Sequence, residues 1–233
     1  MLDRADMIVP HSNAVVFGRE FYSEGDEFPL LYTNIYNNYA KADNRRCGMC
    51  CVYRLQKKGN VFSSSLVQII AIGFAEDQKL WRSAGDICDV RPYGNFVVDA
   101  QKGIYYAFVM RDGEKTTRYF AFDLPKLGDG KVDGELGVEK VTLGENDIKE
   151  YFDTPYHAFI QGACLHQSRI YSVEGFNEKI HPALRIIDCE LKKQVLFCDF
   201  FDEGIEHEAE MIVFYKERCY YSDVKGALFE LEF

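Results

Sequence analysis

Short apolar runs alternate with polar turns throughout the chain, and the pattern is clearest between Tyr156 and Phe200. Four apolar runs lie in that stretch, each about as long as a β-strand: Ile160–Leu165, Ile170–Val173, Leu184–Cys189 and Val195–Phe200. The residues between them are rich in Gly, Ser, Asn, Lys and Pro, which favour turns. The stretch is therefore predicted to be a four-stranded antiparallel unit, the form of one β-propeller blade.

The spacing inside the first hairpin of this unit recurs elsewhere in the chain. Gln161 is followed ten residues later by Tyr171, and the same offset separates two other pairs, which are Asn95 and Tyr105, and Glu210 and Tyr220. A fixed internal offset is the signature of a repeat architecture. Three hairpins are therefore predicted to share one length and one register.

Third strands are predicted wherever a short apolar run closes on a charged residue. The pattern occurs four times, at residues 51–54, 120–123, 185–188 and 229–232. Fourth strands are expected after the first three of these, at Leu66–Ile72, Val138–Leu143 and Val195–Phe200. The modules then cover residues 11–75, 91–145, 156–200 and 207–233 plus 7–9.

The predicted fold class is all-β, a β-propeller of four recognisable four-stranded blades in one domain spanning residues 1–233. The last module lacks a fourth strand, and Met7–Val9 near the N-terminus is apolar enough to supply it. Such a donated strand would close the ring and protect its edge. The alternative is that the chain forms the C-terminal part of a larger ring of five to six blades.

Several segments carry a family resemblance: PHSNAVVFG, DEFPLLYTNIYN, RPYGNFVVD, RYFAFDLPKL, FIQGACLHQSRIYSVEGF and CYYSDVKGALFELEF. Together they resemble an uncharacterised family of bacterial propeller proteins, mostly from Firmicutes and Bacteroidetes. The resemblance covers most of the chain. It implies the fold and carries no established activity.

Composition narrows the range of partners and compartments. The formal net charge is −10, and Lys and Arg form no stripe of the kind that binds a phosphate backbone, so no nucleic-acid partner is expected. No apolar run is long enough to span a membrane, and the N-terminus does not resemble a signal peptide. Most of the eight cysteines lie inside apolar runs, as buried thiols do in a reducing compartment. A cytoplasmic protein is predicted.

Candidate site residues follow from position, because the first strand of each propeller blade lines the central axis. The starts of the four predicted first strands carry polar side chains: His11, Asn13, Arg91, Tyr93, Asn95, His157, Gln161, His207, Glu208 and Glu210. A converging group of this kind suits a small polar ligand. The same side chains could instead hydrogen-bond only to one another and to channel water. Histidine beside Glu208 or Glu210 could hold a divalent metal, but a lone histidine more often caps a loop, so no metal site is predicted.

Two functions follow from this group. The first is non-catalytic binding of a small polar molecule, or of a partner protein, at the axial mouth. The second is a hydrolase or lyase acting on a carbohydrate or another polar metabolite, with His157 or His11 as general base and Glu208, Glu210 or Arg91 positioning the substrate or a metal. The chain has no nucleophile elbow, phosphate loop or HExxH motif, so the sequence names no cofactor and leaves the oligomeric state open.

Overall fold

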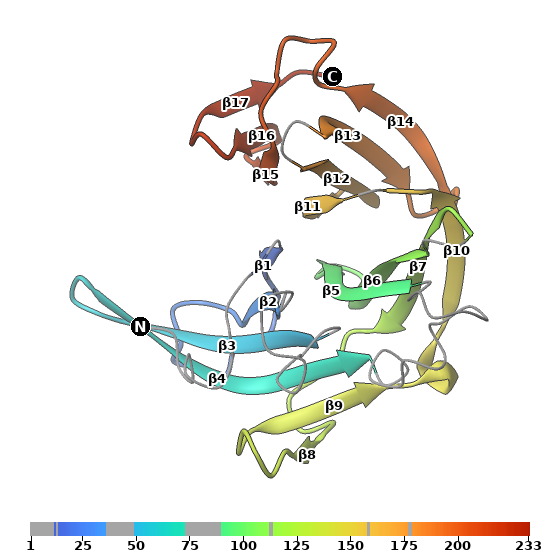
Figure 1. Ribbon diagram of the computed structural model, residues 1–233. Coiled ribbons are helices and arrows are strands. Elements are labelled where there is room, and N and C mark those ends of the chain that lie inside the picture. The colour runs from blue at the N-terminus through green and yellow to red at the C-terminus, as the bar shows by residue number, and fades with distance from the viewer. Residues whose placement is uncertain are drawn as a thin grey trace.

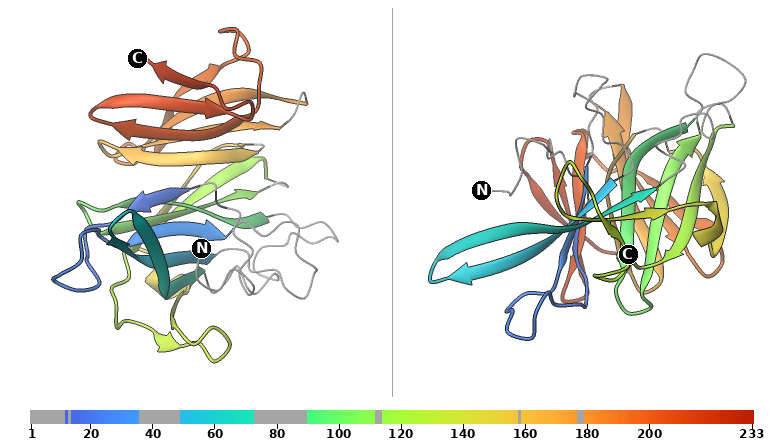
Figure 2. Two further views of the ribbon diagram at one scale, coloured as in Figure 1. Left: turned by 90° about the vertical axis from the view of Figure 1, so that its left-hand side faces the viewer. Right: turned by 90° about the horizontal axis from the view of Figure 1, so that it is seen from below.

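The computed structural model describes residues 12, 14–35, 49–72, 90–111, 114–157, 159–176 and 179–233, with backbone only at residues 35 and 90–95. Within these residues the chain forms four antiparallel-based sheets that follow one another around a common axis (Figure 1; Figure 2). The regular helical structure in this part is a single 3-10 turn at Glu145–Asp147. The protein is thus an all-β, four-bladed β-propeller, as the sequence predicts.

The first sheet begins with four strands in the order of the chain, followed on its outer side by two added strands. The four are β1 (Val15–Phe17), β2 (Leu31–Ile35), β3 (Met49–Lys58) and β4 (Val61–Ile72). The added strands are β9 (Glu139–Leu143), which runs parallel to β4, and β8 (Lys131–Val132), which is antiparallel to β9. The predicted fourth strand at residues 66–72 is confirmed as part of β4.

The second sheet corrects one prediction about strand pairing. Its order from the outside inwards is β10 (Glu150–Pro155), β7 (Thr116–Asp123), β6 (Ile104–Arg111) and β5 (Val90–Asp99). The expected fourth strand, residues 138–143, is therefore wrong for this sheet, because that segment pairs with β4 of the first sheet. The chain crosses back to the second sheet only at β10, which pairs with β7.

The third and fourth sheets follow the predicted order. The third consists of β11 (Ile160–His166), β12 (Arg169–Phe176), β13 (Ile180–Asp188) and β14 (Lys193–Asp199). The fourth has three described strands, β15 (Ala209–Tyr215), β16 (Arg218–Asp223) and β17 (Leu228–Leu231). The strand expected to complete it, Met7–Val9, lies outside the described residues.

The hairpin register is confirmed in all three modules that carry the ten-residue offset. Tyr105 pairs with Val98, Tyr171 with Cys164 and Tyr220 with Val213, so each tyrosine occupies the same rung of its first hairpin. Two of the hairpin turns use residues with positive φ, Gln167–Ser168 and Lys216–Glu217. These two-residue turns match the right-handed twist of the strands they join.

Apolar side chains fill the spaces between neighbouring sheets, and each interface is a separate core. One cluster joins the first and second sheets, a second joins the second and third, and a third joins the third and fourth. A further cluster covers the opposite face of the first sheet, where Leu136 and Val138 pack from the segment that precedes β9. The packing of neighbouring sheets against one another through these clusters fixes the positions of the innermost strands.

The last sheet has one open face among the described residues. On β15, Met211, Val213 and Tyr215 are 42%, 37% and 61% exposed, whereas Phe96 and Val98 on the equivalent strand β5 are buried. The difference arises because β5 packs against strands of both the first and the third sheet, whereas the main contacts of β15 with another sheet are with β11 and β12 of the third sheet.

Candidate functional site

The innermost strands of the sheets lie side by side around the axis. β11 packs beside both β5 and β15, and β5 also contacts β2 and β3 of the first sheet (Figure 1). In the third and fourth sheets this close approach depends on Gly162. A Cβ atom there would lie 3.0 Å from the Glu210 carbonyl oxygen and 3.2 Å from the Met211 Cα atom. Glycine therefore lets the backbones of β11 and β15 approach one another.

Two of the predicted axial residues are β-bulges. On β11, Ile160 pairs with Glu174 and Gly162 with Val173, so Gln161 is an extra residue in the ladder. On β15 the register shifts in the same way between Ala209 and Met211, which leaves Glu210 as the extra residue. A bulge redirects a side chain and locally interrupts strand pairing, and bulges are common beside functional sites.

β5 carries a larger irregularity at the matching end. Arg91 pairs with Met110 and Asn95 with Phe108, so three residues of β5 stand against one residue of β6. The side chains of Arg91, Tyr93 and Asn95 lie outside the described part of the structure, as do His11 and Asn13. The backbone nevertheless departs from regular pairing at the same end of three inner strands.

Gln161 links the third sheet to the fourth. Its Nε2 atom donates one hydrogen bond to the Glu208 Oε1 atom and a second, of 3.0 Å, to the Gly175 carbonyl oxygen. Glu208 directly precedes β15, and the backbone of Glu210 on β15 lies against Gly162, the residue after Gln161 on β11. Gln161, Glu208 and Glu210 therefore lie on adjoining parts of β11 and β15. We call these three residues the axial group.

The axial group is rich in hydrogen-bond acceptors and negative charge. Partial burial raises the pKa of Glu210, and the neighbouring Glu208 carboxylate raises it further. Burial and a like charge both disfavour the ionised form of a carboxyl group. The Glu210 carboxyl group therefore takes up a proton at a higher pH than an ordinary glutamate does.

His157 lies elsewhere, at the interface between the second and third sheets. It is fully buried, its backbone N–H donates a 2.9 Å hydrogen bond to the Thr117 Oγ1 atom, and its ring meets that of Tyr119 edge-on at 6.3 Å. Thr117 and Tyr119 belong to β7, the third strand from the axis. The structure therefore does not bring His157 to the axial group.

A buried ion pair accompanies His157. The Arg185 Nε and Nη2 atoms donate to the Glu174 Oε1 atom at 2.9 and 2.8 Å, and both side chains are largely buried. Burial lowers the pKa of His157 well below its usual value, and the positive charge of Arg185 lowers it further. Neither ring nitrogen of His157 has a hydrogen-bond partner within the described residues. The lowered pKa favours the neutral form of this enclosed imidazole.

His207 is exposed, and its carbonyl oxygen accepts a 3.2 Å hydrogen bond from the Tyr221 hydroxyl.

The sequence did not lead us to predict Asn34, which is buried on β2 of the first sheet. Its Oδ1 atom accepts hydrogen bonds from the Ala14 N–H at 3.0 Å and from the Ser12 hydroxyl at 2.9 Å. The sequence signal that could have indicated Asn34 is its position as a polar residue inside the apolar run Leu30–Ile35.

The described residues contain no group of three or more His, Cys, Asp or Glu side chains that could hold a metal ion. Six described cysteines are free thiols, and burial raises the pKa of both Cys189 and Cys219 to about 12. The part of the chain that the structure describes includes no helix long and apolar enough to cross a bilayer.

Comparison with known proteins adds structural likenesses only. No family model matches the chain, and no curated protein matches it. Among solved structures, the chain is similar to a GH43 β-1,3-galactosidase bound to galactodeoxynojirimycin, with 10% identity, a TM-score of 0.41, and coverage of 93% of this chain and 73% of that one. A computationally designed protein, Ika8, has 10% identity, a TM-score of 0.31 and coverage of 93% and 69%. At these values the likenesses assign no activity.

Proposed function

We propose that the protein binds a small polar molecule at the axial group and does not act on it chemically. The observation that carries the proposal is the pair of bulges at Gln161 and Glu210, which interrupt pairing at equivalent positions of neighbouring inner strands. Interrupted pairing leaves polar groups available to a ligand. A few convergent polar side chains on a rigid scaffold are typical of small-molecule sites.

The charges of the axial group indicate the kind of ligand. Two carboxyl groups and one amide oxygen can accept hydrogen bonds, so a ligand rich in hydroxyl or ammonium donors is favoured. An anionic ligand would be repelled by Glu208 and Glu210. We therefore infer a neutral or cationic polyhydroxylated molecule, such as a sugar or an amino sugar.

Calorimetric titration with glucosamine, glucose and glucuronate tests this inference. Glucosamine is expected to bind best and glucuronate worst, because their charges differ while their hydroxyl groups are alike. Gln161→Ala and Glu210→Gln are expected to weaken glucosamine binding about tenfold, the loss of one charge-assisted hydrogen bond. Glu203→Gln, on an exposed turn, is the control for removal of a charge. Binding that is equally strong in all four proteins would refute the proposal.

A second candidate is a carbohydrate hydrolase using the same group. The raised pKa of Glu210 beside Glu208 favours it, because glycoside hydrolysis needs one protonated and one ionised carboxyl group. The base would then be a carboxylate, since His157 is buried at another interface. The test is release of nitrophenol from aryl glycosides. Release by the wild-type protein that is abolished in Glu208→Gln and also in Glu210→Gln would favour the enzyme. No release from any of these substrates would favour binding alone.

We also propose a compartment, a class of partner and a family for the protein. Free buried thiols support a reducing compartment, and we place the protein in the cytoplasm. Its net charge of −10 supports a small molecule or a protein as partner rather than nucleic acid. We also propose that it belongs to the uncharacterised bacterial propeller family that its segments resemble.

A further inference from the structure

The outermost strands of the second and third sheets differ in what they expose. β14 is the edge strand of the third sheet and lies on the outside of the ring (Figure 1). Three consecutive apolar residues of β14, Val195, Leu196 and Phe197, are 42%, 36% and 50% exposed. On β10, the edge strand of the second sheet, the exposed residues include Asp153 and Pro155. Charged residues and proline protect an edge strand from association, so β14 is the less protected of the two edges.

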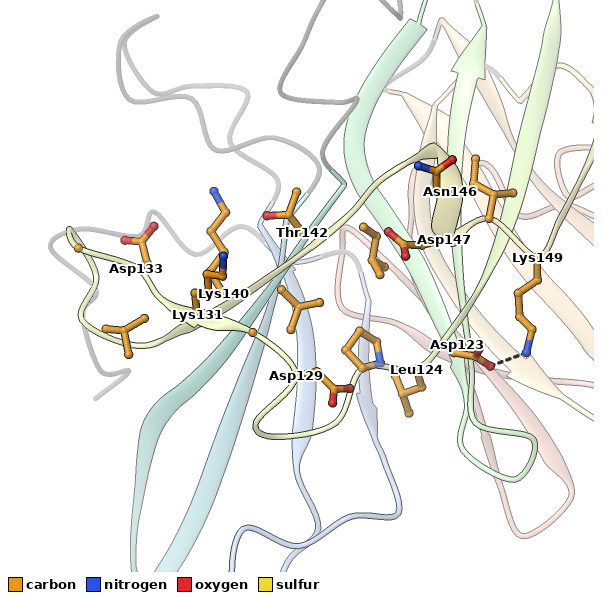
Figure 3. A pocket seen from close by; sticks show the side chains of 17 residues that line it. Asp123, Leu124, Asp129, Lys131, Asp133, Lys140, Thr142, Asn146, Asp147 and Lys149 are labelled. Atoms are coloured by element: carbon orange, nitrogen blue, oxygen red, sulfur yellow. Dashed lines mark hydrogen bonds and ion pairs between the residues drawn. The ribbon is translucent and has the colours of Figure 1, made fainter.

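A groove of about 970 Å³ elsewhere on the rim has a different character. It lies between the β8–β9 hairpin and the segment after β7, and its lining carries charges of both signs (Figure 3). Asp129 and Asp147 accept 2.8 Å hydrogen bonds from backbone N–H groups of their own turns, and Asp123 pairs with Lys149 at 2.5 Å. These mixed charges favour no single class of ligand, whereas the edge at β14 is apolar at its centre.

The exposed apolar side chains of β14 lie on both faces of the strand. Leu196 pairs with Ile186, which packs in the cluster between the third and fourth sheets. Phe197 pairs with Arg185 on the opposite face, and the Arg185 guanidinium lies 4.5 Å from the centroid of the Phe197 ring. Arg185 is itself held by its ion pair with Glu174. The Phe197 ring is therefore supported from below, and a surface that is ordered in advance loses less entropy on association.

The charges of β14 make the strand complementary to a second copy of itself. Lys193 lies at its start and Asp199 at its end, and Leu196 is midway between them. An antiparallel arrangement about a two-fold axis at Leu196 would place Lys193 opposite the partner's Asp199, and Val195 opposite the partner's Phe197. Opposite charges, and a β-branched residue facing an aromatic one, are favourable pairs between neighbouring strands. A parallel arrangement would place like charges together.

Both charged residues are able to make this contact. Lys193 is exposed. Asp199 accepts a 3.0 Å hydrogen bond from the Phe201 N–H, and its Oδ2 atom lies 3.1 Å from the His181 Nδ1 atom. A carboxylate accepts about four hydrogen bonds, so Asp199 has room for a lysine as well. Because the chain has a net charge of −10, two copies repel one another unless a positive group meets a negative one where they touch, and Lys193 supplies that group.

We propose that the protein forms a two-fold symmetric dimer in which the β14 strands of two copies pack antiparallel through Val195, Leu196 and Phe197, with Lys193 paired to the partner's Asp199. Val195 is the extra residue of a β-bulge, and bulges discourage a hydrogen-bonded ladder from continuing past an edge. The contact is therefore made by side chains. Each pair occurs twice, because the interface is two-fold symmetric. β14 is at the opposite edge of its sheet from β11, so the dimer contact is separate from the axial group.

Sedimentation equilibrium of the full chain measures the dimer. Leu196→Lys brings two ammonium groups together at the two-fold axis and is expected to weaken dimerisation about tenfold or more. Val132→Lys introduces the same charge at an apolar residue of β8 that is 77% exposed, and this matched control should dimerise as the wild type does. Circular dichroism checks that both variants are folded. A wild-type protein that is monomeric at every concentration tested, or equal weakening by both variants, would overturn the proposal.

Reversal of charge tests the antiparallel arrangement. Lys193→Asp and Asp199→Lys each place like charges opposite one another in a homodimer, so each variant alone should dimerise about tenfold more weakly or worse. A mixture of the two variants should form a heterodimer with a Kd close to that of the wild-type dimer, because each contact again joins opposite charges. Two folded variants that remain monomeric when mixed would contradict this arrangement of the β14 strands.

Discussion

At the level of single residues, the interface between the second and third sheets concentrates buried polarity. Glu174 and Arg185 form an ion pair there, and His157, Tyr119 and Ser172 are buried nearby on elements facing the same interface. Buried charges are costly unless each has its partner. The stability of this interface should therefore depend on keeping the pair intact and His157 neutral.

Arg185→Met is expected to lower the free energy of unfolding by about 3 to 5 kcal/mol, because the buried Glu174 would lose the positive charge of Arg185. The double variant Glu174→Leu with Arg185→Met should recover most of that loss. Chemical denaturation measures both. Arg169→Met removes an ion pair with Asp188 in which the arginine is half exposed, and should cost less than about 1 kcal/mol. Equal losses for Arg185→Met and Arg169→Met would contradict the expectation.

His157 should make the protein sensitive to acid. Its pKa is depressed in the folded state, so below the ordinary value of about 6.5 the unfolded chain binds more protons than the folded chain. Stability is then lost as pH falls below that value, by up to about 1.4 kcal/mol per pH unit for one group. His157→Phe should remove this slope between pH 6.5 and 5, as measured by denaturation at several pH values. An identical slope in the variant would show that other groups cause it.

Glu210 should affect the pH dependence of stability in the direction opposite to His157, and more weakly. Its folded pKa is raised, so the folded state holds the proton more tightly, and the destabilisation at neutral pH is relieved as pH falls through the folded pKa. Glu210→Gln should increase stability at pH 7 by no more than about 0.5 kcal/mol, because burial of the Glu210 carboxylate is only partial and solvent screens much of its charge. The gain should disappear near pH 4, and a gain independent of pH would contradict the cause given.

At the level of strands and turns, Gly162 determines how closely the third and fourth sheets approach. Gly162→Ala is expected to destabilise the fold by about 1 to 3 kcal/mol, because the new methyl group meets the backbone of β15. It should also weaken ligand binding by moving Gln161 away from Glu208. Gly134→Ala, where nothing lies within 4 Å, is the control and should change stability by less than about 0.5 kcal/mol. Calorimetric unfolding compares the two.

Strand register was predictable and one strand assignment was not. The ten-residue offset ending at Tyr105, Tyr171 and Tyr220 gave the hairpin register because it depends on local turn length and alternation. Residues 138–143 and 150–155 both have β-forming sequences, and only tertiary pairing sends the first to β4 and the second to β7. In the same way, no local signal could place His157 against Thr117, forty residues earlier.

At the level of the whole molecule, the fourth sheet has three described strands and an open face on β15. The sequence predicts that Met7–Val9 adds to the edge at β17. Ile8→Asp is then expected to lower the free energy of unfolding by more than about 1 kcal/mol, because a charge would replace an apolar strand residue. Leu2→Asp, outside the predicted strand, is the control. Equal stability of both variants and the wild type would argue against this strand.

The described residues concentrate polar side chains in the axial group and in the buried interface around His157. In the axial group, side chains predicted from the repeat form a contact between the third and fourth sheets, the hydrogen bond from Gln161 to Glu208. The most direct test is nuclear magnetic resonance mapping of the isotope-labelled protein during titration with glucosamine. The predicted result is that shifts concentrate at Gln161, Gly162, Gly175 and Glu210. Shifts concentrated elsewhere, with these four residues unchanged, would contradict the assignment of the axis as the binding site.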